Sequence, residues 1–452
     1  MVSCIPPPRA HWRLFSCCGA IFIAIAIATR AFLATHYGPV IAGDSVPYLQ
    51  LSEMIRTHDY SSYNGWRTHG YPWFLNLFHA VPSTVVLAQN IVGGLGTFLV
   101  SFVFLKMTRK PLTSVLLGGF LALSLNLVLL DEYILTESIS TSLFSLFSAT
   151  LVFSFAHSRS SYWAWAFCGL SVAALTLTRP QYVSLIPSIA LCLCLRIILS
   201  HSNWKSMLAL LLFLACSLPP VLLLLSFNKS NLGKATLSTT LSFNLSQHTL
   251  PFIEAAERVD ETHLIPEIVR LRDQNWEQAQ ALDDNRAFIP RPDPYPLPDV
   301  YTRLSLEAIR REPLLYLSSV CRAWVRFWRV SLLYDSSFLR SPLFSSMVPW
   351  FWRLQKCIWL VANMLFVVNL PLVALTIFKR RYLGWLEFLS LSILAVSILQ
   401  ALVEYGDNSR YAVPMEPAIA LVALYSSTVA NSCRFTLASL VKAARNTRKG
   451  NP

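Results

Sequence analysis

The sequence predicts an all-α protein that crosses a membrane many times. Of its 452 residues, 54% are hydrophobic and only 13% are charged, whereas soluble domains usually contain about 25% charged residues. Apolar runs of roughly 20 residues recur along the chain, which is the length that crosses a hydrocarbon core about 30 Å thick. The basic residues gather in short loops and in the C-terminal tail, as they do in loops that stay in the cytoplasm.

Ten apolar segments are long enough to be membrane spans. The first is longer than the apolar core of a typical signal peptide and other spans follow it, so we expect an uncleaved helix. The fifth ends before Pro180, because proline disfavours a helical conformation in the residue that precedes it. The predicted spans are residues 14–34, 83–105, 112–130, 134–156, 161–178, 181–200, 206–227, 355–378, 383–403 and 413–432.

The positions of the basic residues predict the orientation. Arg9 and Arg13 precede the first span, which places the N-terminus in the cytoplasm. The clusters at residues 106–110, at 379–381 and in the tail then fall on the same side. This topology accounts for the net charge of +13, so no nucleic-acid partner is expected. The predicted outer loops are residues 35–82, 131–133, 179–180, 228–354 and 404–412.

The spans divide the chain into four predicted parts. Residues 1–227 form an N-terminal transmembrane half that contains the first outer loop. Residues 228–354 form an extracytoplasmic subdomain, residues 355–432 hold the C-terminal spans, and residues 433–452 are a basic cytoplasmic tail. The ten cysteines include no CxxC pair, so neither a disulfide framework nor a zinc site is predicted.

One apolar segment, residues 314–334, is not predicted to cross the membrane. Arg322, Arg326 and Arg329 share one face of a helix there, and three arginines at mid-bilayer are costly. We therefore expect an amphipathic helix that lies in the interface. Its arginines either anchor it there or bind anionic headgroups or a carrier phosphate.

Charged residues lie at the predicted outer ends of several spans. Asp44 and Arg67 are in the first outer loop, Glu137 is beside the second, Arg179 is at the third and Arg410 is in the last. A transporter is expected to place such charges near the midplane of the membrane, whereas an enzyme at the membrane surface needs them at the interface. The sequence therefore favours an outer-face reaction centre over a transporter or flippase.

Five short motifs give the sequence a family resemblance. They are, in order, Gly43-Asp44-Ser45 with Tyr48, Arg67 with Gly70-Tyr71-Pro72, Leu135-Thr136-Glu137, Thr178-Arg179-Pro180, and Asn408-Ser409-Arg410-Tyr411 with Pro414. In this order, on one side of the membrane, they resemble the GT-C glycosyltransferases, especially the branch of the protein O-mannosyltransferases and the lipid A aminoarabinose transferases. The resemblance covers roughly residues 14–429. It implies a bundle of about 10–11 transmembrane helices, with interfacial helices and a small extracytoplasmic segment.

The same resemblance implies a multi-pass enzyme of the bacterial inner membrane with its active site on the periplasmic face. It implies inverting transfer of a hexose or pentose from a polyprenyl-phosphate carrier to a glycan, a lipid or a surface protein. No nucleotide cofactor is expected. An oligosaccharide ligase, which moves whole lipid-linked glycans, shares this chemistry and stays open beside the transporter or flippase.

The resemblance also implies roles for individual residues. Asp44 is the base that deprotonates the acceptor hydroxyl, which requires a carboxylate within hydrogen-bond reach. Its alternative role is an N-cap for the helix-like run that follows. The leaving phosphate needs donors, and the arginine fork suits phosphate, so Arg67, Arg179 and Arg410 are candidates. Their alternative is snorkelling to the headgroups. Glu137 is the second catalytic candidate, which could orient an arginine or bind the sugar.

Four further residues complete the predicted substrate site: Tyr71, Asp131, Tyr182 and Tyr411. Asp131 has an alternative role, because an acidic side chain favours the positive N-terminal end of a helix. A divalent metal could be held by Asp44 together with one of the other acids.

Overall fold

The computed structural model describes residues 9–155, 161–200, 204–255, 270, 298–380, 383–406 and 408–428. Every regular element in these ranges is helical, and the β contact between Val40 and Tyr133 is an isolated bridge. The predicted all-α fold is therefore confirmed. The α-helices are α1 (Arg9–His36), α2 (Ser45–Thr57), α3 (Gly70–Leu77), α4 (Pro82–Thr108), α5 (Pro111–Ala122), α6 (Leu125–Val128), α7 (Thr136–Ser154), α8 (Ser161–Thr178), α9 (Leu185–Ser200), α10 (Trp204–Leu232), α11 (Thr240–Ala255), α13 (Pro298–Arg311), α14 (Pro313–Phe327), α15 (Pro342–Arg380), α16 (Trp385–Val403) and α17 (Asn408–Ala412).

Several of these helices are long and apolar enough to cross a membrane. A bent pair, Pro111–Ala122 with Leu125–Glu132, adds one more span if the two pieces cross together. Each of the ten predicted spans overlaps helical residues in the described part of the chain, which by length and composition provides five or six spans. The five unbroken ones are Pro82–Thr108, Pro180–Leu199, Trp204–Leu232, Phe344–Lys379 and Trp385–Val403.

Helix α7 explains part of the lower count. It covers the predicted span 134–156, but nine of its 19 residues are serine or threonine. The hydroxyls of Thr141, Ser145 and Ser148 donate hydrogen bonds of 2.8 to 2.9 Å to carbonyls four residues earlier. A helix of this composition is tolerated because several of its hydroxyls bond to its own carbonyls and most of its residues are buried in the bundle. The last predicted span, 413–432, runs beyond the described residues.

The bend between α5 and α6 is held by a side chain from α15. At the break, Gln355 donates through Nε2 to the carbonyl of Leu123 at 2.9 Å and accepts from the amide of Leu125 at 2.8 Å. Trp359 donates to the hydroxyl of Ser124 at 2.8 Å. Backbone groups freed in an apolar bundle need such partners, because an unmet donor or acceptor is costly there. One glutamine thus satisfies both sides of the break.

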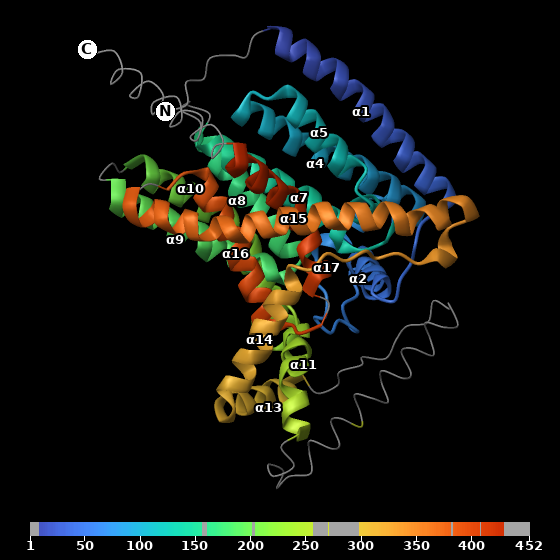
Figure 1. Cartoon of the computed structure of the whole chain (residues 1–452). Coiled ribbons are helices and arrows are strands. Elements are labelled where there is room, and N and C mark those ends of the chain that lie inside the picture. Colours follow the sequence, from blue (N-terminus) through green and yellow to red (C-terminus); the bar gives the residue numbers. More distant parts are fainter. Residues whose placement is uncertain are drawn as a thin grey trace.

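Helices α11, α13 and α14 group together at one end of the bundle, away from α1 (Figure 1). Thr249 of α11 donates to Ser305 of α13 at 2.9 Å, and the His248 ring is hydrogen-bonded to Ser319 of α14 at 2.8 Å. These helices belong to the predicted extracytoplasmic part, residues 228–354. The four-part division of the chain itself stays a prediction.

Helix α14 differs from the predicted 314–334 helix. It ends at Phe327, because Phe327 and Val330 are buried in the core and the Trp328 carbonyl accepts from Asn363 of α15 at 2.9 Å. It also lies along α16, where Tyr316 donates to the Leu402 carbonyl at 2.6 Å. The predicted arginine face is divided as a result: Arg322 and Arg329 are exposed, whereas Arg326 is half-buried.

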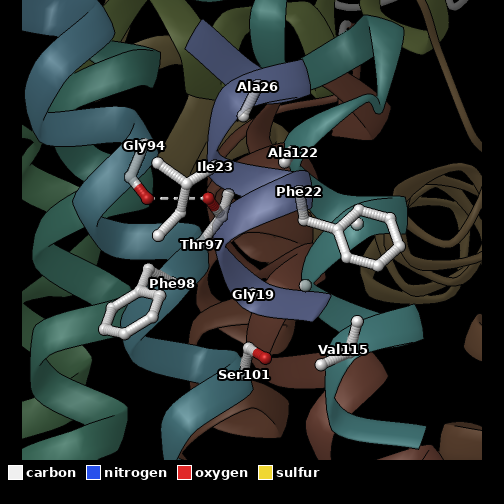
Figure 2. Close-up of a pocket in the computed structure, with 12 residues that line it drawn as sticks. Gly19, Phe22, Ile23, Ala26, Gly94, Thr97, Phe98, Ser101, Val115 and Ala122 are labelled. Carbon is white, nitrogen blue, oxygen red and sulfur yellow. Dashed lines mark hydrogen bonds between the residues drawn. The ribbon is translucent and has the colours of Figure 1, made fainter. Parts of the chain in front are cut away.

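A pocket between α1, α4 and α5 is lined by small and apolar residues (Figure 2). Its two hydroxyls are already engaged, since Thr97 donates to the Gly94 carbonyl at 2.8 Å and Ser101 to the Ser114 carbonyl at 2.6 Å. The absence of side chains at Gly118 and Gly119 lets α5 approach its neighbours, because a Cβ at Gly118 would lie 2.8 Å from the Ser101 hydroxyl. The pocket therefore offers an apolar surface.

Candidate active site

Two carboxylates and three guanidiniums from five separate parts of the chain meet at one place. Asp44 precedes α2, Arg67 precedes α3, Glu137 is in the first turn of α7, Arg179 follows α8, and Arg410 is in α17. Two ion pairs involve Asp44, with Arg67 at 3.0 Å and with Arg410 at 3.0 Å. Two more involve Glu137, with Arg179 at 3.2 Å and with Arg410. The structure therefore brings together the acidic and basic residues that the sequence singles out at four predicted outer loops.

Asp44 stands at the N-cap position of α2, but its side chain does not cap the helix. No hydrogen bond joins its carboxylate to the first turn of α2. A tight turn places it instead, with the Ser45 amide donating to the Ala42 carbonyl at 2.8 Å and the Ala42 amide to the Ser45 hydroxyl at 3.0 Å. The capping alternative is thus wrong for the side chain, which points to Arg67 and Arg410.

Arg67 is held by aromatic rings and by the end of α8. Its guanidinium lies over the Tyr48 ring at 4.6 Å and over the Trp66 ring at 5.3 Å. The next residue, Thr68, donates to the Thr178 carbonyl at 3.0 Å. Gly70 sits so close to α8 that a Cβ there would lie 2.6 Å from a backbone atom of Leu177. This close approach fixes the loop of Arg67 beside the residue that precedes Arg179.

Glu137 is the buried centre of the arrangement. Its side chain is 0% exposed, and its Oε1 atom receives Arg179 through Nη2 and Arg410 through Nε. Arg179 also stacks over the Tyr411 ring at 4.6 Å. A buried carboxylate needs partners of opposite charge because desolvation otherwise penalises the ionised form. Glu137 therefore orients two arginines, which is one of the two roles considered for it.

Arg410 connects the two carboxylates. Its Nε atom donates to Glu137, whereas Nη1 donates to Oδ2 of Asp44 at 3.0 Å. The preceding loop is held by a bond of 2.7 Å from Asn408 to the Glu404 carbonyl and by Arg326 stacked over the Tyr405 ring at 4.3 Å. One arginine of the predicted 314–334 face thus supports this loop.

Exposure and charge distinguish the two carboxylates. The Asp44 side chain is 49% exposed, whereas Glu137 is inaccessible. Partial burial alone raises the pKa of the Asp44 carboxyl, but Arg67 and Arg410 outweigh this effect and hold the pKa below its ordinary value. Three guanidiniums against two carboxylates leave the cluster with one excess positive charge. Two buried arginine nitrogens within it, Nε of Arg67 and Nη1 of Arg179, have no hydrogen-bond partner among the described residues.

Asp131 lies in a different polar network. Its carboxylate pairs with Arg30 at 3.1 Å and accepts from Ser138 at 2.6 Å. Its backbone carbonyl accepts from Gln89 at 2.9 Å, and Gln89 in turn accepts from the Tyr71 hydroxyl at 2.7 Å. Asp131 and the hydroxyl of Tyr71 are therefore engaged by other residues, and their predicted role in substrate binding stays a prediction.

The two remaining predicted tyrosines differ in their relation to the cluster. Tyr411 lies under the Arg179 guanidinium, as described above. Tyr182 is 0% exposed, its ring packs near that of Phe144 at 5.9 Å, and its phenol interacts electrostatically with Arg179 and Glu137 of the cluster. Their roles as substrate-binding residues also stay predictions.

Arg30 is a structural partner that the sequence interpretation missed. It is 6% exposed, pairs with Asp131 and donates to the Ala122 carbonyl at 3.1 Å. The sequence did contain a signal for such a contact, because a single arginine inside the apolar run 14–34 must find a partner within the bundle. Its contact with Asp131 could not be located without the fold.

The acidic residues of the cluster do not form a metal-binding group. Among the described residues no set of three or more histidine, cysteine, aspartate and glutamate side chains is placed to hold a metal ion. Each carboxylate of the cluster instead faces guanidiniums. This donor-rich arrangement suits an anionic group better than a cation.

Comparison with known proteins yields two distant structural likenesses. No protein-family model and no curated protein sequence matches the chain. The structure of ArnT from Cupriavidus metallidurans in the apo state is similar at a TM-score of 0.38, and that of ArnT bound to undecaprenyl phosphate at 0.36. Each is 13% identical in sequence, over 89% of this chain and 76% of the other.

Proposed function

We propose that this chain is a GT-C-type membrane glycosyltransferase that moves a sugar from a polyprenyl-phosphate carrier to an acceptor hydroxyl. One observation carries the proposal: an excess of guanidinium groups surrounds a half-exposed carboxylate beside long apolar helices. The guanidiniums suit the phosphate of a lipid carrier, and the half-exposed carboxylate suits the hydroxyl of an acceptor. The order of the sequence motifs supports the same assignment.

Asp44 is the proposed base because it is the accessible carboxylate of the cluster. In the proposed step the acceptor oxygen forms a bond to the anomeric carbon of the sugar while its proton passes to an Asp44 oxygen. The bond between the anomeric carbon and the phosphate oxygen breaks, and its electron pair stays on the phosphate. Attack from the side opposite the phosphate gives inversion. Such a base contributes when its carboxylate lies within hydrogen-bond reach of the hydroxyl.

Arg67, Arg179 and Arg410 are the proposed hydrogen-bond donors to the carrier phosphate. Their guanidiniums exceed the carboxylates by one charge, and two of their buried nitrogen atoms have no partner among the described residues. Bonds between arginine and phosphate are strengthened by charge. Donors fixed in advance around a leaving group stabilise charge as it develops in the transition state. Glu137 and the rings of Tyr48 and Tyr411 hold these arginines in place.

The long apolar helices support the proposal that the sugar donor is a lipid that stays in the membrane. A lipid-linked sugar can present its phosphate at the helix ends while its chain remains among apolar side chains. We place the enzyme in the bacterial inner membrane, with the site on the periplasmic face and the extracytoplasmic part, residues 228–354, beside the acceptor. The acceptor class is a glycan, a lipid or a surface protein, and the sugar is a hexose or pentose.

The test uses membranes that contain the full chain and a polyprenyl monophosphate carrying a radiolabelled sugar. We expect label to move to a product that no longer partitions with the carrier, and Asp44→Asn to reduce this rate by about 100-fold or more. Asp59→Asn is the matched control, because Asp59 is an exposed acid of the same loop whose carboxylate accepts only from the nearby Ser61 among the described contacts.

Full activity in Asp44→Asn would contradict the assignment of the base. Movement of the labelled lipid across the bilayer without a new glycosidic bond would identify a flippase instead. Transfer of a whole lipid-linked oligosaccharide, with no transfer from the monophosphate sugar, would identify a ligase.

A further inference from the structure

Both oxygens of the Asp44 carboxylate are occupied. Oδ1 receives Arg67 Nη2 and Oδ2 receives Arg410 Nη1, each at 3.0 Å. A base must itself approach the hydroxyl whose proton it takes. In this arrangement each oxygen already accepts a hydrogen bond from a guanidinium, and such bonds favour the charged carboxylate and so make it a weaker base. The base is therefore held in two ion pairs, although its side chain is 49% exposed.

We propose that Glu137 is a positioning residue that keeps Arg410 in place while the carrier phosphate replaces Asp44 on the arginine nitrogens, so that carrier binding releases the base from its ion pairs. This inference rests on the proposed function. It assigns an order to the reaction, in which the carrier binds before the acceptor is deprotonated.

The atoms of Arg410 allow such an exchange. Glu137 takes Nε, and Asp44 takes Nη1. A guanidinium is planar and carries five N–H donors in fixed directions. With Nε held from behind by a buried carboxylate, the terminal nitrogens keep their position when the partner in front changes. Lysine has no equivalent pair of donor sites on one rigid group.

Burial decides which carboxylate is replaced. Glu137 is 0% exposed and is bonded to both Arg179 and Arg410, so losing them would leave a buried charge without partners. Asp44 is 49% exposed, and water can solvate its carboxylate once the arginines turn to phosphate. Ion pairs of partly exposed groups contribute little to stability. Phosphate therefore competes with Asp44 and not with Glu137.

The charge of the donor fits this exchange. Three guanidiniums and two carboxylates carry one net positive charge. A sugar joined to a polyprenyl monophosphate is a phosphodiester with a single negative charge, which makes the occupied cluster neutral. A released Asp44 then faces a phosphate and has fewer bonds to arginine. Both changes favour its protonated form and make it a stronger base than in the free protein.

The test measures how fast a hydrophobic carbodiimide labels individual carboxyl groups of the full chain in lipid nanodiscs. Carbodiimides react with protonated, accessible carboxyl groups. We expect slow labelling of Asp44 in the free protein and a rise of about tenfold on adding a polyprenyl monophosphate sugar without acceptor, which corresponds to one pKa unit. Asp59 is the internal control, because it is exposed in the same loop and its labelling is expected to stay constant.

Two variants test the part played by Glu137. In Glu137→Ala, the rise at Asp44 is expected to disappear, whereas in Glu137→Gln an amide oxygen still accepts from Arg410 Nε and part of the rise is expected to return. Arg410→Lys keeps the charge but lacks the rigid planar group that bonds two partners through separate nitrogens, so it also loses the rise. Native mass spectrometry of the same samples establishes that each variant is folded and binds the lipid.

Unchanged or slower labelling of Asp44 in protein shown to hold the lipid would overturn the inference. An equal rise in Glu137→Ala and in the unmodified chain would overturn the role of Glu137. Failure of the proposed function is a separate result: the labelling rise is then observed, but no variant and no unmodified protein transfers sugar. Conversely, transfer that depends on Asp44 without any labelling rise would leave the function standing and reject the exchange.

Discussion

Arg410 Nη1 lies 3.0 Å from Asp44 Oδ2, although 366 positions separate the two residues in the sequence. The same guanidinium reaches Glu137 through Nε. An arginine of α17 thus joins an exposed acid that precedes α2 to a buried acid in the first turn of α7. This connection makes the cluster a single electrostatic unit, in which a change at one residue affects the others.

Removal of the buried carboxylate is expected to destabilise the fold. Glu137→Ala leaves Arg179 and Arg410 buried or partly buried without their shared partner, and breaking such a pair costs about 3–5 kcal/mol. The midpoint of thermal unfolding in detergent should fall clearly. Glu53→Ala is the control, since Glu53 is exposed and its carboxylate pairs only with Arg56 of α2 among the described residues. A similar loss in both variants would contradict this account.

The stability that Asp44 contributes should depend on pH in the acid range. Arg67 and Arg410 hold the pKa of the folded carboxyl below its ordinary value, which is about 3.9. A lowered pKa means that the contribution is fully present above the unfolded value and disappears as the pH falls through the folded value. The difference in melting temperature between the unmodified chain and Asp44→Asn should be constant above about pH 5 and shrink below about pH 4. Because the side chain is half-exposed, the difference is expected to be modest. A difference that grows on acidification would reject the lowered pKa.

The close approach of α3 to α8 should make Gly70 sensitive to substitution. In Gly70→Ala the new Cβ would lie 2.6 Å from the backbone of Leu177, and forcing apart such a contact costs about 1–3 kcal/mol. The loop that carries Arg67 moves with it, so activity should fall together with the melting temperature. Gly94→Ala is the matched control, because a Cβ at Gly94 meets nothing within 4 Å. Equal effects of the two substitutions would show that packing at Gly70 is not the cause.

The bend between α5 and α6 should depend on Gln355. Gln355→Ala removes the partner of two backbone groups at the break, and each unmet buried group costs about 1–3 kcal/mol. Thermal unfolding and protease digestion of reconstituted protein report this loss. Lys356→Ala, at an exposed neighbouring position of α15, should leave both unchanged. If Gln355→Ala unfolds at the temperature of the unmodified chain, another group or water supports the break.

The sequence was sufficient to predict the all-α membrane fold, because apolar runs and basic loops are properties of local composition. It also pointed to Asp44, Glu137 and three arginines, because these charges lie at the predicted outer ends of several spans, within motifs that resemble one family. What local composition cannot supply is the pairing. The bond of Arg30 with Asp131, for example, depends on how α1 packs beside the turn before α7.

The end of α14 illustrates a second kind of difference. Local spacing favours one continuous helix through Tyr334, with three arginines on a common face. The structure ends the helix at Phe327, where burial of that ring and the bond from Asn363 to the Trp328 carbonyl compete with helix continuation. Tertiary contacts of this kind override local preference.

The double attachment of Arg410 has a consequence for how the protein is made. Glu137 enters the membrane during synthesis long before the ribosome reaches Arg410, which lies 273 positions further along. Arg179 is available much sooner and can neutralise Glu137 while the remaining chain is still being inserted. Asp44 has Arg67 as its early companion in the same way. Each acid thus has an arginine partner close by in the sequence during insertion. The Asp44–Arg67 pair and the Glu137–Arg179 pair are joined only when Arg410 is inserted.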